Sequence, residues 1–420
     1  MRRWEKSVKV SDVITLWLFD FSTFVDHYRN WLTHLKQRIM KRLSLITIAA
    51  AMVAACNTQQ EQTISTLKID TDKVVQNESV DCIIDTTSLE FVILETTDDC
   101  LLGFAEQIGY RGDTIIIFDK STQIIFFFDS KGHYLSKIHR VGRSRTEYVE
   151  IDNLCFTNDE VIIYDWDGKI VAYGFDGRFR YSFEVPKAQS LYEKDGNILV
   201  AHGWNVSEDT EWGRVSVYNK KGERLSALLK IDEADANRAD WSDTKYINGF
   251  GDSLFFMAPF DNVVYKYENG DFVPAYQFDF GADNLPAKVA REGAMSKTDK
   301  NYSYAYEFRE TERFRFAGFH GANKKFLISW VFDKKKKQTV AMSNVCKINS
   351  IGGIWPEINR IDDSGKYFFN YIPVSAAKRW QAEDYKKLGD KSVWPKEVAS
   401  LPDDDNGVII RVRLKNLNDD

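Results

Sequence analysis

Short apolar runs rich in β-branched and aromatic residues alternate along the chain with short polar turns. The stretch "IIFFFDSKGHYLSKI", from Ile124 to Ile138, holds an apolar run, a turn ending in glycine, and a run in which polar and apolar positions alternate. This pattern predicts a β-hairpin. Glycine suits the turn because a tight hairpin needs a residue that accepts a positive φ.

The same pattern recurs three times, over residues 170–185, 215–231 and 263–278. The four turn glycines, Gly132, Gly177, Gly222 and Gly270, are separated by 45, 45 and 48 residues, and a further β-rich run precedes each hairpin. A period of about 40–50 residues with three or four short strands per unit is typical of a β-propeller. One blade cannot cover its own faces, so the repeats must stack around an axis.

The pattern is less regular after residue 281. We interpret residues 282–324 as an insertion, with a helix in "NLPAKVAREGAM" and an aromatic, charged segment in "NYSYAYEFRETERFRF". Residues 324–342 predict another hairpin, and "AAKRWQAEDYKKLG" predicts a second helix. We expect a strand near Val408–Leu414 to share a blade with Phe91–Leu94, which closes the ring. The predicted fold is all-β: a six-bladed β-propeller of four-stranded antiparallel blades, with helical insertions in the C-terminal part.

The segment "MKRLSLITIAAAMVAAC", from Met40 to Cys56, has the order of a bacterial export signal. A charged start precedes an apolar stretch too short to span a bilayer. Residues 53–56, Val-Ala-Ala-Cys, match a lipobox, which predicts cleavage before Cys56 and lipid attachment to its thiol; an ordinary secretory signal is the alternative. No Asp follows Cys56, so we expect an outer-membrane lipoprotein of the cell envelope, either periplasmic or surface-facing.

These signals divide the chain into four parts. Residues 1–39 are interpreted as an over-extended N-terminus, with a genuine amphipathic helix as the alternative; 40–55 are the signal peptide, 56–63 the lipidated tether and 64–420 the propeller. Removal of residues 1–55 takes away nine Lys/Arg and four Asp/Glu, which changes the formal net charge from −6 to −11. Such an acidic chain disfavours nucleic acid as a partner. The remaining cysteines show no CxxC motif, and a Cys82–Cys100 disulfide stays open.

Several stretches resemble a known family, the six-bladed β-propeller lipoproteins of Gram-negative gut bacteria, which are related to NHL-type propellers. The resemblance rests on "FVILETTDDCLLG" (91–103), the hairpin at 124–138, "HRVGRSRTEYVEIDNLCF" (139–156) and "NGVIIRVRLKN" (406–416). It implies the propeller fold but no particular activity. The chain departs from the family where Arg143-Ser144-Arg145-Thr146 replaces Gly and Pro, and where Asn406-Gly407 replaces Asn-Pro.

Motifs of established chemistry are not found. The sequence lacks a GxSxG elbow, a Walker A loop and an HExxH pair, so we predict no catalytic residue, cofactor or metal site. "DWDGKIVAYGFD" (165–176) is interpreted as a hairpin turn because an EF-hand needs Gly and Glu where Ile170 and Asp176 stand. A carboxylate pair of the glycosidase type is defined by its separation in space, which sequence does not show.

The candidate ligand-binding residues are aromatic and charged side chains in predicted loops: Arg143, Arg145, Glu147, Trp166, Trp204, Trp212 and Trp241. Loop tryptophans beside polar residues stack on sugars or bind peptides, although packing between blades is the alternative. For the arginines, surface ion pairing is the alternative. We predict a non-enzymatic binding or scaffold module for a glycan, a peptide or an envelope protein, tethered to the membrane through Cys56. The alternative is a glycan-active hydrolase or lyase with a carboxylate or histidine site at the axis.

Overall fold

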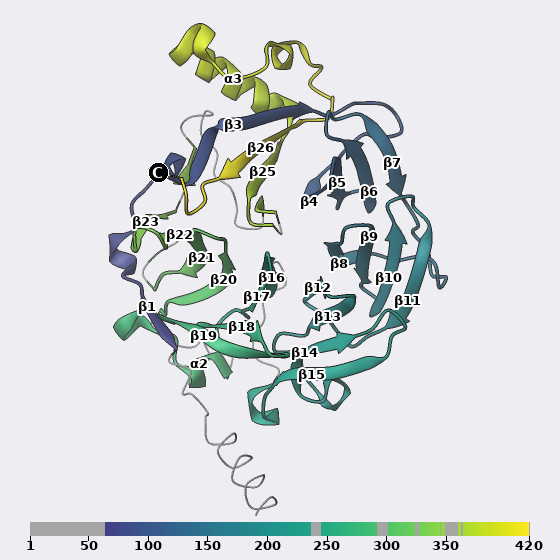
Figure 1. Ribbon diagram of the computed structural model, residues 1–420, viewed down its shortest axis with the longest axis vertical. Coiled ribbons are helices and arrows are strands. Elements are labelled where there is room, and N and C mark those ends of the chain that lie inside the picture. The colour runs from purple at the N-terminus through teal and green to yellow at the C-terminus, as the bar shows by residue number, and fades with distance from the viewer. Residues whose placement is uncertain are drawn as a thin grey trace, which may run out of the picture. The chain divides into compact units, whose positions relative to one another are not determined.

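Six small sheets stand around a common axis in the computed structural model (Figure 1). The structure describes residues 64–236, 245–291, 301–322, 324, 327–344, 346–348, 360–362 and 364–419. Residues 64–420 form one compact unit. Cys56 and the predicted boundaries before residue 64 lie outside the described residues. In the part of the chain that is described, no helix has the length and apolarity to cross a membrane.

We name the sheets blades A to F in chain order. Blade A holds β4 (Ala105–Arg111), β5 (Thr114–Asp119), β6 (Ile124–Asp129) and β7 (Tyr134–Ile138). Blade B holds β8 (Ile151–Phe156), β9 (Glu160–Asp165), β10 (Lys169–Gly174) and β11 (Phe179–Glu184). Blade C holds β12 (Ser190–Lys194), β13 (Asn197–Ala201), β14 (Gly213–Tyr218) and β15 (Arg224–Lys230).

Blade D holds β16 (Ile247–Phe250), β17 (Ser253–Phe256), β18 (Val263–Glu268) and β19 (Asp271–Asp279). Blade E holds β20 (Tyr304–Glu310), β21 (Phe314–His320), β22 (Leu327–Asp333) and β23 (Gln338–Ser343). Blade F holds β25 (Tyr367–Ile372), β26 (Val408–Leu414) and β3 (Ile84–Ile93), and its innermost position is described as a single bridge between Ile361 and Phe368. The prediction of a six-bladed antiparallel propeller is confirmed.

The ring is closed by pairing the two ends of the folded unit. β26 is antiparallel to β3, with Val408 opposite Ile93 and Leu414 opposite Ile84. The predicted closure is therefore confirmed. The preceding N-terminal segment follows the outer edge of the ring: β1 (Ser65–Lys68) is parallel to β19, and β2 (Glu78–Ser79) is parallel to β24 (Cys346–Lys347). The closing pair and the edge strands all lie within residues 64–420, the compact unit of the propeller.

Each pair of neighbouring blades encloses its own apolar cluster, which gives six clusters around the ring. Between blades A and B, for example, Phe127 of β6 and Ile163 of β9 are buried in the same cluster. A strand in the middle of a blade faces a neighbouring blade on both sides, so β9 is buried along its whole length. This explains the continuous apolar runs that the sequence shows.

The four predicted turn glycines all have positive φ, of 90° at Gly132, 73° at Gly177, 84° at Gly222 and 90° at Gly270. Each connects the third and fourth strands of its blade. In blade E the corresponding turn contains four lysines, and Lys337 takes a φ of 55°. The segment 165–176 is a hairpin within blade B, as predicted.

One interpretation was wrong. Residues 304–320 are not part of an insertion but form β20 and β21, the first two strands of blade E. Their apolar alternation is interrupted by Arg309 and Arg313, which are buried, and an arginine in a strand normally indicates a solvent-facing position. The insertion itself lies between β19 and β20 and includes α2 (Ala287–Arg291), where a helix was predicted.

The second predicted helix is α3 (Val374–Leu388), inserted between β25 and β26 at the outside of blade F (Figure 1). The described residues also include the short 3-10 helices η1 (Thr71–Lys73), η2 (Asp81–Ile83), η3 (Glu208–Thr210), η4 (Glu233–Asp235), η5 (Gly281–Asp283), η9 (Gly389–Lys391) and η10 (Lys396–Ser400). No disulfide joins the described cysteines Cys82, Cys100, Cys155 and Cys346, so the Cys82–Cys100 bridge does not form in this structure.

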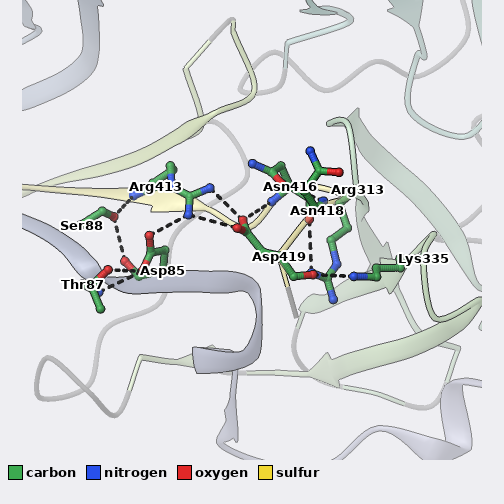
Figure 2. Close-up of polar contacts among 9 residues, drawn as sticks. All are labelled: Asp85, Thr87, Ser88, Arg313, Lys335, Arg413, Asn416, Asn418 and Asp419. Atoms are coloured by element: carbon green, nitrogen blue, oxygen red, sulfur yellow. Dashed lines mark hydrogen bonds and ion pairs between the residues drawn. The ribbon is translucent and has the colours of Figure 1, made fainter.

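A polar clasp connects the C-terminal tail to blades E and F (Figure 2). Arg413 of β26 binds Asp85 of β3 at 2.7 Å and Asp419 at 2.8 Å. Arg313 is fully buried, pairs with Asp333 at 2.9 Å, and donates to the Asp419 backbone carbonyl at 2.9 Å. The clasp therefore holds the end of the closing strand against the neighbouring blade.

Candidate functional site

Polar side chains link the innermost strands of successive blades around the axis. From blade A to B, Nε2 of Gln107 donates to the Leu154 carbonyl at 3.5 Å. From B to C, Nδ2 of Asn153 donates to the Gln189 carbonyl at 3.2 Å. From C to D, Oγ of Ser190 accepts from the Tyr246 backbone N–H at 3.2 Å.

The other three junctions follow the same rule. From D to E, Nδ2 of Asn248 donates to the Phe308 carbonyl at 3.1 Å. From E to F, Nη2 of Arg309 donates to the Asp362 carbonyl at 2.7 Å. From F back to A, Nη1 of Arg360 donates to the Glu106 carbonyl at 3.2 Å. We call these six contacts the axial belt. They satisfy buried and partly buried backbone groups and connect each blade to the next around the axis.

A cavity and a wider pocket lie along this axis. The cavity has a volume of about 30 Å³ and is lined by residues of all six blades, which leaves room for little more than a water molecule. It continues into a pocket of about 460 Å³, which we call the axial mouth. The two share Arg111, Cys155, Phe156, Tyr192 and Asp362. A ligand larger than a water molecule therefore fits in the axial mouth but not in the cavity.

The axial mouth is built from the turns between first and second strands. Its polar lining is Arg111, Thr157, Asn158, Glu193, Asp362 and Ser364, with Tyr110 and Tyr192 beside them. Several of these groups are held by their own turns. Oε1 of Glu193 accepts from the Gly196 backbone N–H at 2.6 Å, and the Asp362 carboxylate accepts from the Tyr367 N–H at 3.0 Å. The lining is therefore polar, and the Glu193 and Asp362 carboxylates are oriented by their own turns.

Two side chains of the axial mouth, Arg111 and Tyr110, differ in their hydrogen bonding. The Arg111 guanidinium donates to the carbonyls of Tyr110, at 2.7 Å, and Phe156, which ties blade A to blade B. The Tyr110 hydroxyl is buried and makes no hydrogen bond with any described residue. Burial raises the pKa of Tyr110 well above its ordinary value, so this phenol stays protonated and is a donor.

The predicted tryptophans have different environments. Trp204 is buried rather than exposed: the Arg214 guanidinium lies 3.8 Å from its ring centroid, and its Nε1 donates to the Pro259 carbonyl at 2.9 Å. Trp212 is half-buried, with a φ of 59°. Trp166 keeps 66% of its side chain exposed. Trp241 lies outside the described residues.

The loop that contains Arg143, Arg145 and Glu147 is not at the axial mouth. Its Arg145 carbonyl accepts from Oγ of Ser182 at 2.9 Å, and Ser182 is on β11, the outermost strand of blade B. Arg143 pairs with Asp167 at 3.4 Å, which brings it beside Trp166. The structure therefore places Arg143 and Trp166 together at the end of blade B that is opposite the turns of the axial mouth.

Sequence reasoning missed the axial mouth. Its residues stand at the end of the first strand of each blade, and the first strands β4, β8 and β12 share no motif. One feature of the sequence could have located these residues. In each blade the turn between the first and second strands comes directly before the predicted second strand. Residues 111–113, 157–159 and 193–196 occupy that position. Counting back along the sequence from each predicted hairpin locates these turns. It does not show that they meet at the axis.

Comparisons with known proteins agree with the fold. A family model described as a domain of unknown function (DUF4934) matches residues 66–413. The crystal structure of a "putative exported protein" from Bacteroides fragilis NCTC 9343 has a TM-score of 0.61 and 19% identity, and the match covers 84% of this chain and 100% of that one. At this identity it shows the fold alone.

A member of the DUF4221 family from Bacteroides vulgatus matches with a TM-score of 0.43 and 8% identity, over 79% of this chain and 99% of that one. A comparison with curated proteins found no match.

Proposed function

Since the chain belongs to the family of the domain of unknown function DUF4934, we propose that its propeller is an exported, non-enzymatic binding module whose axial mouth holds the polar end of a glycan or peptide. The observation that carries this proposal is the axial mouth itself, a pocket of about 460 Å³ with a polar lining. Concave sites with a few fixed polar groups are the usual form of a ligand site.

Export and tethering are supported by the sequence. Residues 40–56 have the order of a lipoprotein signal, and Cys56 is the proposed lipid attachment site. The Bacteroides fragilis protein of the same fold is described as exported, which agrees with this reading. In the proposed arrangement the tether of residues 56–63 holds the propeller at the outer membrane, where envelope glycans, peptides and proteins are within reach.

The state of the carboxylates favours binding over catalysis. A hydrolase of the alternative kind needs two carboxyl groups placed on either side of a bond. In the axial mouth, Glu193 and Asp362 accept hydrogen bonds from the backbone of their own turns. Groups held in this way define the shape of a pocket and offer hydrogen bonds to a ligand. An enzymatic role remains the alternative function.

The proposal is tested by thermal-shift measurements on residues 64–420 with neutral oligosaccharides and with short peptides that lack acidic side chains. A ligand that binds only the folded protein raises the Tm with concentration. Asn158→Trp, which fills the axial mouth from an exposed turn, is expected to abolish the shift, and Trp166→Ala on blade B is the control. The proposal is wrong if a neutral oligosaccharide or peptide that stabilises the protein is bound equally well by Asn158→Trp.

A further inference from the structure

A second surface lies at the end of blade B opposite the turns that form the axial mouth. Between β7 and β8 the chain exposes three arginines within six residues: Arg140, Arg143 and Arg145. The side chain of Arg143 is 82% exposed. This concentration of positive charge is unusual for a chain whose formal net charge is −6. Arginine is the residue best suited to bind carboxylate, sulfate or phosphate groups, because its planar fork donates two parallel hydrogen bonds.

The backbone that carries these arginines is fixed. The Tyr148 N–H donates to the Arg140 carbonyl at 3.0 Å, and the Gly142 N–H donates to the Tyr148 carbonyl at 2.8 Å. Farther along, Oη of Tyr173 donates to the Thr146 carbonyl at 2.7 Å. The carbonyl of Arg145 also accepts from blade B, as described above. The arginine side chains therefore extend from a rigid loop, which lowers the entropy lost when they bind a ligand.

Trp166 lies next to this loop with most of its ring in solvent. The neighbouring Asp167 pairs with Arg143 at 3.4 Å, and the Trp166 N–H donates to the Glu150 carbonyl at 3.0 Å. A tryptophan ring exposed to this extent is uncommon, because its large apolar area is normally buried. An exposed ring beside a carboxylate and a guanidinium offers a stacking face together with a hydrogen-bond acceptor and a donor.

The acidic groups near the loop do not cancel its arginines. The Glu147 carboxylate accepts from the Ser144 N–H at 2.9 Å and is turned into its own loop. The Asp167 carboxylate forms an ion pair with Arg143, and Glu150 is exposed at the end of the loop. Among the described residues, Arg140 and Arg145 form no ion pair within 4.0 Å. Hydrogen bonds from Ser144, and then the charges of Lys169 and Arg140, lower the pKa of the Glu147 carboxyl. The Arg145 guanidinium is therefore the one most available to an anion.

We propose that this surface binds an acidic polysaccharide. We call it the arginine–tryptophan rim and define it by Arg140, Arg143, Arg145, Trp166 and Asp167. A sugar ring stacks on Trp166, Asp167 accepts a hydrogen bond from a hydroxyl, and the arginines bind carboxylate or sulfate groups along the chain. The site is separate from the axial mouth, and the proposal does not depend on a ligand there.

A polysaccharide fits this surface better than a protein. A stable protein interface buries about 800 Å² per partner around an apolar centre. On the two segments that form the rim, residues 139–150 and 165–168, the exposed large apolar side chains are Val141 and Trp166. One aromatic face surrounded by charged and polar groups is too small for such a centre but sufficient for one sugar ring.

The test measures binding of residues 64–420 to three polymers by biolayer interferometry: polygalacturonate, dextran sulfate and neutral dextran. We expect binding to at least one polyanion, no binding to dextran, and weaker binding as salt is raised. Arg143→Ala with Arg145→Ala, and Trp166→Ala separately, are each expected to weaken binding by about ten-fold or more. Polygalacturonate and dextran sulfate distinguish a carboxylate from a sulfate ligand.

The matched control removes the same charge from another part of the ring. Arg178→Ala with Lys221→Ala changes two exposed cations in the turns that connect third and fourth strands, and is expected to alter the affinity less than about two-fold. Far-UV circular dichroism and the Tm show whether each variant is folded. Asn158→Trp in the axial mouth is expected to bind the polyanions normally.

Four outcomes overturn the proposal. If the protein binds neither polyanion, the proposed site does not exist. If it binds neutral dextran equally well, charge does not determine binding. An equal loss in the Arg178/Lys221 control shows that attraction is not localised to the rim. Unchanged binding by the folded Trp166→Ala and Arg143/Arg145 variants, with a loss in Asn158→Trp, places the ligand in the axial mouth; this contradicts the rim while supporting the proposed function.

Discussion

Nη2 of Arg309 donates a 2.7 Å hydrogen bond to the backbone carbonyl of Asp362, and this contact joins the innermost positions of blades E and F. It is one of six such contacts around the axial belt. In each, a side chain of one blade binds the backbone of the next, so the belt couples neighbours that share no strand pairing. The axial mouth is formed by residues adjacent to this belt, and its shape depends on the same contacts.

The belt predicts a stability effect at Asn153. Asn153→Ala removes the bond to the Gln189 carbonyl and the bond that Oδ1 accepts from the Leu191 N–H at 3.3 Å. Two partly buried backbone groups then lose their partner, and the free energy of unfolding should fall by about 1–3 kcal/mol. Urea unfolding measures this. Asn158→Ala, in an exposed turn, is the control, and an equal effect of both changes would contradict a role for the belt.

His202 predicts a dependence of stability on pH. Its ring is buried, with Nδ1 2.7 Å from the Lys187 carbonyl and Nε2 2.9 Å from Oγ of Ser216. Burial lowers the pKa of His202 from its ordinary 6.5 to about 4. The unfolded chain therefore binds a proton at a higher pH than the folded protein. Stability from this group is complete above pH 6.5 and falls by about 3 kcal/mol as the pH drops to 4.

The measurement for His202 is urea unfolding at several pH values between 4 and 7.5. His202→Gln removes the titrating group, so its free energy of unfolding should change less over this range than that of the native protein. Because the substitution also disturbs a buried site, the slope against pH is compared rather than the absolute stability. Equal slopes for the two proteins would show that His202 is not the responsible group.

The buried ion pair between Arg313 and Asp333 predicts that substitutions at these two positions have non-additive effects on stability. Arg313→Met leaves the Asp333 carboxylate buried without its main partner and should lower the free energy of unfolding by about 3–5 kcal/mol. Adding Asp333→Leu removes that unpaired charge, so the double variant should be more stable than Arg313→Met alone. A double-mutant cycle in urea checks this, and simple additivity of the two changes would contradict the prediction.

Lipid attachment predicts where the protein is found in the cell. Cys56→Ser removes the proposed attachment site, and the protein should move from the membrane fraction to the soluble fraction because a thioether-linked lipid can no longer form. Labelling with a clickable fatty acid should also be lost. Cys82→Ser, at an exposed thiol of the propeller, is the matched control. Membrane association that persists in the Cys56 variant would exclude this tether.

The strand pattern predicted most of the fold because a hairpin is a local structure. Turn glycines such as Gly132 and Gly177 are required by backbone geometry within four residues, so their spacing reveals the blade repeat directly. The same reasoning failed at residues 304–320, where Arg309 and Arg313 break the apolar pattern. Their burial depends on partners distant in the chain, such as Asp362 and Asp333.

The sequence predicted much less of the candidate sites than of the fold. Trp166 and Trp204 both follow a second strand of a blade and look alike in sequence, yet one is exposed and the other is covered by Arg214, which pairs with Asp261 from the next blade. The axial mouth collects residues from turns that share no motif. By itself the sequence determined the repeat and most of the strands, because these depend on local geometry and on apolar periodicity. The closing pair was predicted from the need to cover the edges of the first and last sheets. Only the tertiary structure decided which side chains meet at the axis and on blade B, because that depends on how the blades are arranged around the ring.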